Sequence, residues 1–180
     1  MGTIMQTTNA LDALISDLKK ASQGTGALAD IKSILASFVE DPKTAKENVP
    51  EYEEDDVILY EDDNISIWFC RFQPDLTVPP HDHQMSATIA VFSGIERNDF
   101  YERAGDQLTQ SGQVELHAGD VIQIAPDEVH GVGCASQEPS CAIHVYMGNL
   151  TNVERSLFDV ANGKVMSFTD ENYQKLTSEN

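Results

Sequence analysis

The sequence has few cysteines, few basic residues and no long apolar run. Its three cysteines, Cys70, Cys134 and Cys141, form no C-x-x-C pair, which argues against a disulfide framework or a zinc ribbon and favours reduced thiols. Lysine and arginine total 11 against 30 acidic residues, and the net charge of −19 disfavours nucleic acid and anionic lipid as partners. No stretch of about 18 apolar residues is present that could form a membrane-spanning helix.

Length and composition are typical of one structural domain with a real core, since 41% of the 180 residues are hydrophobic. Met1 to Gln6 lack a basic segment followed by an apolar block, so we expect no secretory signal and a cytoplasmic protein, either monomer or homodimer. We expect residues 1–50 to form a helical preface, residues 51–165 a barrel, and residues 166–180 a polar tail.

Helical periodicity is confined to two regions. Near the N-terminus, two amphipathic helices are predicted on either side of the Gly24-Thr25-Gly26 turn, and Asp41-Pro42 is expected to end the second. Their apolar positions are Leu11, Leu14, Ile15 and Leu18, and then Leu28, Ile31, Leu35 and Phe38. A short helical piece is also predicted after Thr151, with Val153, Leu157 and Val160 on one face.

From Val57 onward the pattern changes to the period of two that is typical of strands. The predicted strands are Val57 to Tyr60, Ile65 to Phe72, Ala87 to Phe92, Val121 to Ala125 and Cys141 to Tyr146. Short strands at near-regular spacing favour a sandwich or barrel over alternating strand–helix units.

Four of the five histidines punctuate these strands. His81-Asp82-His83 is an H-x-H pair at the expected start of a strand, and residues two apart on a strand project to the same face. His130 opens another strand after a turn, and His144 lies within an apolar strand. Because imidazole is a preferred ligand of iron, copper, zinc and nickel, this arrangement predicts a metal site. His117 precedes a turn and is expected on the exterior.

The H-x-H pair, Gly94, the Gly119-Asp120-Val121 turn, His130 and the His144-Val145-Tyr146 strand together resemble the thiol dioxygenases of the cupin superfamily. These are the cysteine dioxygenase and 3-mercaptopropionate dioxygenase families. The resemblance covers about Ile65 to Asp159, and it implies a mostly β fold, a cupin double-stranded β-helix (jelly-roll barrel), here with two N-terminal α-helices. It also implies that His81, His83 and His130 hold Fe(II), with room left for a thiol substrate and O2.

The same resemblance assigns roles around the metal. His144 and Tyr146 match the family's histidine and tyrosine beside the iron, with Tyr146 donating to bound oxygen or substrate and His144 orienting it. Arg155 matches the arginine that pairs with the substrate carboxylate, and Arg71 is the competing cation, while Arg97 is expected on the outer sheet. The substrate would be a small thiol carboxylate, 3-mercaptopropionate-like or cysteine-like, oxidised to its sulfinic acid.

This chain departs from the family pattern at several points. Ala87 and Thr88 stand where many cupins have a glutamate ligand, and Ala142 replaces the relay serine. The acidic stretch Val57 to Ser66 offers neither the early arginine of the cysteine dioxygenases nor the glutamine of the mercaptopropionate group, and the cross-linking cysteine is missing. Two alternatives stay open, namely another metal-dependent cupin enzyme (a lyase, isomerase or C–C cleaving dioxygenase) and a non-enzymatic metal- or ligand-binding cupin.

Overall fold

The computed structural model describes residues 8–105 and 107–178. Four helices lie in this part of the chain: α1 (Asn9–Ser22), α2 (Ala27–Val39), α3 (Pro42–Asn48) and α4 (Asp170–Ser178). Eleven strands lie between α3 and α4: β1 (Asp56–Glu61), β2 (Ser66–Phe72), β3 (Thr77–His81), β4 (Ala87–Ser93), β5 (Ile95–Ala104), β6 (Gln107–His117), β7 (Val121–Ile124), β8 (Val129–Cys134), β9 (Ser140–Tyr146), β10 (Ser156–Asp159) and β11 (Lys164–Ser167). The five predicted strands correspond to β1, β2, β4, β7 and β9.

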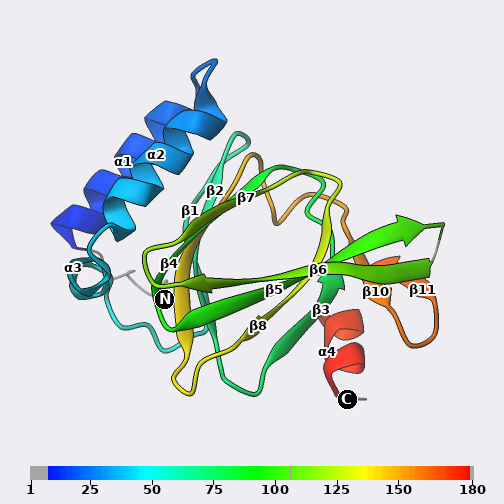
Figure 1. Ribbon diagram of the computed structural model, residues 1–180. Helices are drawn as coiled ribbons and strands as arrows, with labels where there is room; N and C mark the ends of the chain where they lie inside the picture. Colours follow the sequence, from blue (N-terminus) through cyan, green and yellow to red (C-terminus); the bar gives the residue numbers. More distant parts are fainter. Residues whose placement is uncertain (1–7, 106, 179–180) are drawn as a thin grey trace, which may run out of the picture.

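The strands form two antiparallel sheets that face each other around a barrel (Figure 1). One sheet has the order β1-β2-β9-β4-β7 and the other β11-β10-β3-β8-β5-β6. The pairs β2·β9, β3·β8, β4·β7 and β5·β6 are those of one long antiparallel ribbon folded over itself. This is the jelly-roll order, so the predicted fold class, the cupin double-stranded β-helix, is confirmed.

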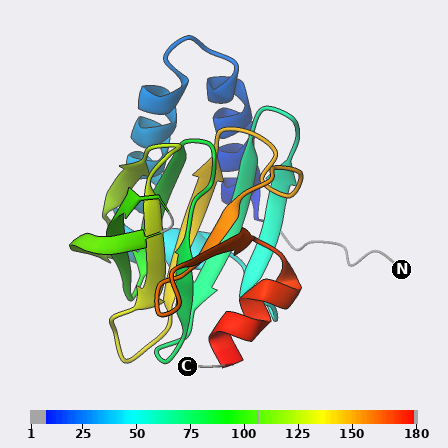
Figure 2. The same cartoon turned by 90° about the vertical axis from the view of Figure 1, so that its right-hand side faces the viewer.

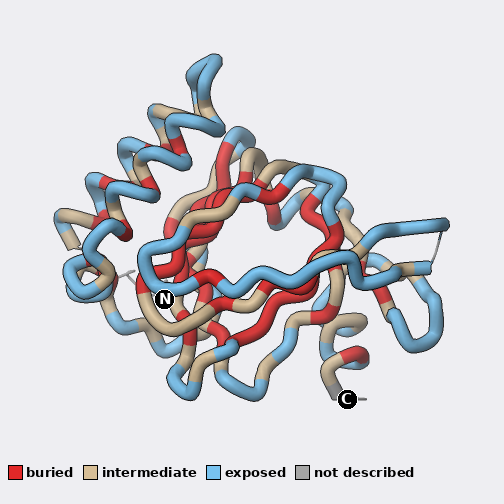
Figure 3. The backbone as a smooth tube through the Cα atoms, in the orientation of Figure 1, coloured by how far each residue is buried: buried red, intermediate tan, exposed pale blue. Residues whose placement is uncertain are grey.

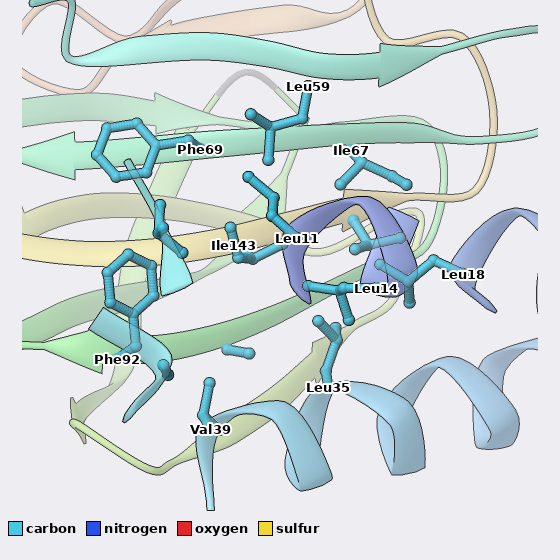
Figure 4. Packing of buried hydrophobic residues seen from close by; sticks show 14 of the residues in the cluster. Leu11, Leu14, Leu18, Leu35, Val39, Leu59, Ile67, Phe69, Phe92 and Ile143 are labelled. Carbon is cyan, nitrogen blue, oxygen red and sulfur yellow. The ribbon is translucent and has the colours of Figure 1, made fainter. Parts of the chain in front are cut away.

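The N-terminal helices cover the outer face of the β1-β2-β9-β4-β7 sheet (Figures 1 and 4). Leu11, Leu18 and Leu35 are fully buried against apolar side chains that this face presents, such as Ile67 and Ile143. Burial of each of these leucine side chains stabilises the folded state by roughly 1.5–3 kcal/mol. Alternate residues of β2 and β9 face the barrel interior instead, so this sheet is buried on both faces.

Asp41-Pro42 begins a third helix, which the sequence analysis missed. The Asp41 carboxylate accepts hydrogen bonds from the backbone N–H groups of Lys43 and Thr44. Pro42 occupies the first turn, where its missing N–H costs nothing and its fixed φ suits a helix. These two residues therefore follow the end of α2 and begin α3, and the described N-terminal part, from residue 8 onward, has three helices where two were predicted.

The prediction of a short helix after Thr151 was wrong. The segment after Thr151 forms β10, because it pairs with β3 and β11 and so extends the second sheet. Leu157 is fully buried but Val160 is 45% exposed, so the two do not share a buried helical face. β11 crosses the predicted boundary at residue 166, and the predicted polar tail contains α4, which lies at the end of the barrel remote from α1 and α2 (Figure 2).

Burial is concentrated along the strands that surround the barrel interior, whereas the β5–β6 hairpin projects outward with an exposed tip (Figure 3). Within residues 8–105 and 107–178, no helix has the length and apolar character needed to cross a membrane.

Candidate metal centre

The three predicted ligands converge inside the barrel from two antiparallel strands. His81 ends β3, His83 follows in the next loop, and His130 lies in β8 directly opposite His81 in the strand register. The H-x-H pair therefore ends a strand rather than starting one. Pro79 and Pro80 can occupy β3 because the β3–β8 pairing is irregular between Val78 and His81, which spares ladder hydrogen bonds that proline cannot make.

The Nε2 atoms of the three rings point at one another. His83 Nε2 lies 3.2 Å from His81 Nε2 and 3.4 Å from His130 Nε2. The side chains are buried, with exposures of 6%, 2% and 1% for His81, His83 and His130. Their ligand atoms all lie within 4.8 Å of one another, so the cluster could hold a metal ion.

Hydrogen bonds on the far sides of two rings leave the converging nitrogens as lone-pair donors. His81 Nδ1 lies 2.9 Å from the Pro79 carbonyl oxygen, which can only accept, so this nitrogen carries the proton. His130 Nδ1 lies 2.8 Å from Asn98 Oδ1 and donates to it in the same way. The Nε2 atoms of His81 and His130 therefore carry no proton, and at least two lone pairs converge on one point. A divalent cation satisfies such a donor set, so the residues fit a metal.

Burial keeps the three imidazoles neutral. Desolvation, reinforced by the positive charge of Arg155, lowers the pKa of His81 to about 3. Desolvation also holds the pKa values of His83 and His130 well below the ordinary value, with a further lowering by neighbouring histidines. Neutral imidazole is the form that binds metals, so protons do not compete for the site near neutral pH.

His144 and Tyr146 lie beside the cluster on β9, and a hydrogen bond of 3.2 Å joins Nδ1 of His144 to the Tyr146 hydroxyl. The Tyr146 ring meets His83 edge to face with a centroid separation of 5.0 Å. Burial raises the pKa of Tyr146 well above its ordinary value, so the phenol stays protonated. The Nε2 atom of His144 lies 3.1 Å from Glu96 Oε2, a contact that the sequence analysis missed.

A cavity of about 330 Å³ adjoins the histidines, and it is lined by residues from both sheets and α4. Arg155, the predicted substrate anchor, lines it with its guanidinium 3.7 Å from the centre of the Phe168 ring. Among the described residues, no carboxylate lies close enough to Arg155 to form an ion pair. Desolvation lowers its pKa, as expected for a cation enclosed by protein.

Asp82, between the two histidines of the H-x-H pair, fixes the position of the Arg155 segment. Its Oδ1 accepts from the Ser156 N–H at 2.8 Å, and its own N–H donates to the Ser156 carbonyl at 3.2 Å. The loop with the metal ligands and the segment with the cation are therefore held together.

The other predicted cations and His117 lie away from the cavity. The Arg71 side chain does not point inward as expected, because its Nε donates to Asp55 Oδ1 at 2.5 Å and its Nη atoms donate to two backbone carbonyls. Arg97 pairs with Asp99 at 3.0 Å on the second sheet. His117 is exposed, as predicted.

Several cavity residues were not identified from the sequence. Asp56 opens β1 and lines the cavity together with Cys70. Asp56 is accessible to water yet crowded by protein, and this desolvation raises its pKa. Phe168 and Tyr173 reach the cavity from the C-terminal region. Thr169, whose hydroxyl caps α4, and the acidic residues after it were the signal for that helix.

The sequence matches no protein-family model and no curated protein. Among solved structures it is similar to an uncharacterised protein with a double-stranded beta-helix domain from Klebsiella pneumoniae, at 21% identity, a TM-score of 0.44, and coverage of 63% of this chain and 93% of the other. It is also similar to a cupin-like protein from Thermotoga maritima, at 21% identity, a TM-score of 0.44, and coverage of 69% and 85%. A DMSP lyase from Ruegeria pomeroyi shows 17% identity, a TM-score of 0.43, and coverage of 53% of this chain and 44% of the lyase.

The fold assignment rests on the strand order. The strand order and the histidine cluster together describe a cupin-fold protein with a three-histidine site that could hold a metal ion.

Proposed function

We propose that the protein is a cytoplasmic mononuclear non-haem iron dioxygenase that oxidises a small thiol carboxylate, 3-mercaptopropionate-like or cysteine-like, to its sulfinic acid. The reaction, RSH + O2 → RSO2H, places both oxygen atoms on sulfur and needs no external reductant. The observation that carries the proposal is the position of Arg155, a cation without an ion-pair partner among the described residues, in the cavity that the three neutral histidines line.

The ligand set suits this chemistry because it has no negative charge. A bound Fe(II) ion would supply the redox chemistry and the open positions for thiol and O2. Three neutral imidazoles would leave its full charge to favour ionisation of an incoming thiol. All three cysteines of the chain are free, in keeping with a reducing cytoplasm.

Arg155 would bind the substrate carboxylate. A guanidinium offers a carboxylate two parallel hydrogen bonds, and the Phe168 ring beneath it restricts its orientation. A cavity of about 330 Å³ is at the small end of the range for ligand sites, which suits a substrate of few atoms.

Tyr146 and His144 would accept the proton that the thiol loses. As the substrate sulfur ionises, its proton passes to the Tyr146 oxygen while the phenol's own proton moves to His144 Nδ1, 3.2 Å away. The resulting imidazolium is paired with the Glu96 carboxylate, and the Tyr146 hydroxyl then donates into the cavity.

Oxygen uptake by the iron-loaded protein tests the proposal, with 3-mercaptopropionate, cysteine, cysteamine and mercaptosuccinate as substrates and the sulfinate product measured by mass spectrometry. We expect uptake and a product containing two labelled atoms when ¹⁸O2 is supplied. If none of the thiols supports uptake, the protein is not a thiol dioxygenase.

A further inference from the structure

A fully buried carboxylate, that of Glu96, connects the histidine cluster with the His144–Tyr146 pair. Glu96, on β5, has no exposed surface. Its Oε1 accepts from Asn98 Nδ2 at 3.0 Å and its Oε2 lies 3.1 Å from His144 Nε2. Asn98 in turn contacts the proposed ligand His130, and His144 contacts Tyr146. Glu96 is thus two hydrogen bonds away from the proposed ligand His130 on one side and from the Tyr146 hydroxyl on the other.

In the branch from Glu96 through Asn98 to His130, the donor and acceptor of each hydrogen bond are fixed by the carboxylate. An ionised Glu96 only accepts hydrogen bonds, so the Asn98 amide must turn its NH2 group toward it. The Asn98 oxygen then faces His130 and accepts from Nδ1–H at 2.8 Å. With the proton held on Nδ1, the His130 Nε2 lone pair faces the metal position.

The second branch is fixed by the other oxygen of Glu96. His144 Nε2 must donate to that oxygen, which places the proton of the neutral ring on Nε2. His144 Nδ1 is then an acceptor, and the Tyr146 hydroxyl donates to it. The phenol oxygen consequently offers lone pairs to the cavity while the site is empty of substrate.

We propose that Glu96 is a positioning residue that sets the histidine tautomer in both branches. The proposal concerns the three-histidine metal centre of the proposed function but not its substrate. It assigns Asn98 as the relay to His130. Partners of this kind behind a ligating histidine typically change metal affinity by about 10–100-fold.

Glu96→Gln is the discriminating change, because it keeps the shape of the side chain and replaces one acceptor with a donor. The glutamine NH2 group must now face either Asn98 or His144. If it faces Asn98, the Asn98 amide turns over and His130 has to protonate Nε2, the nitrogen that should bind metal. If it faces His144, that ring has to move its proton to Nδ1 and the Tyr146 hydroxyl is reversed.

Adding Asn98→Asp to Glu96→Gln restores the pattern, since the carboxylate introduced by Asn98→Asp accepts from the glutamine and from His130 Nδ1–H together. Asn98→Asp alone places two carboxylates against each other and should weaken the site. Asp99→Asn is the matched control, because Asp99 is a nearly buried acid on the same strand that bonds Arg97, Gln110 and Gln113 instead.

The experiment is an anaerobic Co(II) titration of each variant, followed by the visible spectrum of the bound ion and by calorimetry. If the glutamine NH2 group faces Asn98, we expect Glu96→Gln to weaken Co(II) binding by about 10–100-fold. If it faces His144, we expect unchanged binding and a proton moved to Nδ1 of His144, read by imidazole ¹⁵N NMR. Asp99→Asn should change neither readout, and the double variant should recover the wild-type affinity, spectrum and tautomers. A folded Glu96→Gln variant with wild-type Co(II) affinity and wild-type tautomers at both rings, or a folded double variant no better than Glu96→Gln, would overturn the proposal.

Imidazole ¹⁵N NMR of the wild-type, metal-free protein gives a second test that needs no variant to fold. We expect His130 protonated on Nδ1 and His144 on Nε2, and the opposite tautomer at either ring would refute the role of Glu96. Neither measurement uses thiol or oxygen, so a protein that binds Co(II) as expected but oxidises no thiol would contradict the proposed function alone.

Discussion

Removing the cation of the cavity tests how the substrate is held. Arg155→Ala deletes the guanidinium that stacks on Phe168 and leaves the three histidines in place. The Tyr146 hydroxyl and its bond to His144 also remain. A thiol with a carboxylate should therefore lose its anchor, whereas a thiol without one should lose little.

The magnitude follows from the enclosed position of Arg155. A hydrogen-bonded contact to a charged group contributes about 1.5–3 kcal/mol, more than an exposed ion pair would. At about 1.4 kcal/mol per factor of ten, the loss corresponds to roughly 10–100-fold in kcat/KM. Most of it should appear as a higher KM, because the carboxylate is held equally in the ground state and the transition state.

Steady-state oxygen uptake with 3-mercaptopropionate and with cysteamine measures the effect. The matched control is Arg97→Ala, which removes a cation that pairs with Asp99 away from the cavity. We expect Arg155→Ala to impair 3-mercaptopropionate selectively and Arg97→Ala to impair neither substrate. An equal loss with both thiols in Arg155→Ala would refute carboxylate binding by this residue.

Three further predictions concern charge and backbone. In Asp56→Asn, KM should rise for cysteine and cysteamine but not for 3-mercaptopropionate, since only the first two offer an ammonium group to this cavity carboxylate; a uniform change across the three thiols would exclude that contact. In the metal-free protein the folded-state pKa of His81, about 3, lies below its ordinary value of 6.5, so the unfolded chain binds the extra proton. The free energy of unfolding should therefore fall as pH drops below about 6.5, by up to about 1.4 kcal/mol per pH unit for this residue. Chemical denaturation at several pH values should show a shallower fall in His81→Gln than in the wild-type protein. Equal pH slopes of the unfolding free energy in the two proteins would contradict the prediction. Gly94→Ala should destabilise the fold by more than the roughly 1–2 kcal/mol that a left-handed backbone costs an alanine, because a Cβ there would lie 2.8 Å from the Pro139 oxygen. Gly163→Ala is the control, since a Cβ at that position meets nothing within 4 Å. Equal melting temperatures for the two variants would refute the steric argument.

Local patterns predicted five of the eleven described strands and a histidine cluster, whereas the choice of His81, His83 and His130 as ligands came from the family resemblance. Alternation in β2, β4 and β9 predicted a sheet, and the inward-facing His144 and Tyr146 follow from the period of two. His81 ends β3, His83 follows in the next loop, and His130 is the second residue of β8, so all three stand close to turns. Sequence spacing therefore located these side chains, although it did not establish their distances.

The parts that were missed depend on tertiary pairing. Glu96 and Asn98 lie in the polar run Glu96-Arg97-Asn98-Asp99 of β5, which is equally typical of a solvent-facing edge strand. Only the pairing of β5 with β8, which sets Asn98 opposite Val132 and Phe100 opposite His130, places this face in the interior. Likewise, β10 is a strand because β3 and β11 lie beside it, and no local pattern specifies those partners.

Anaerobic titration of the protein with Fe(II), monitored by calorimetry and by metal analysis after desalting, tests the central claim most directly. The three converging Nε2 atoms predict one ion per chain, with binding lost in His83→Ala and unchanged when the exposed His117 is replaced by alanine. An absence of stoichiometric binding by the wild-type protein, or full binding by His83→Ala, would contradict the three-histidine centre.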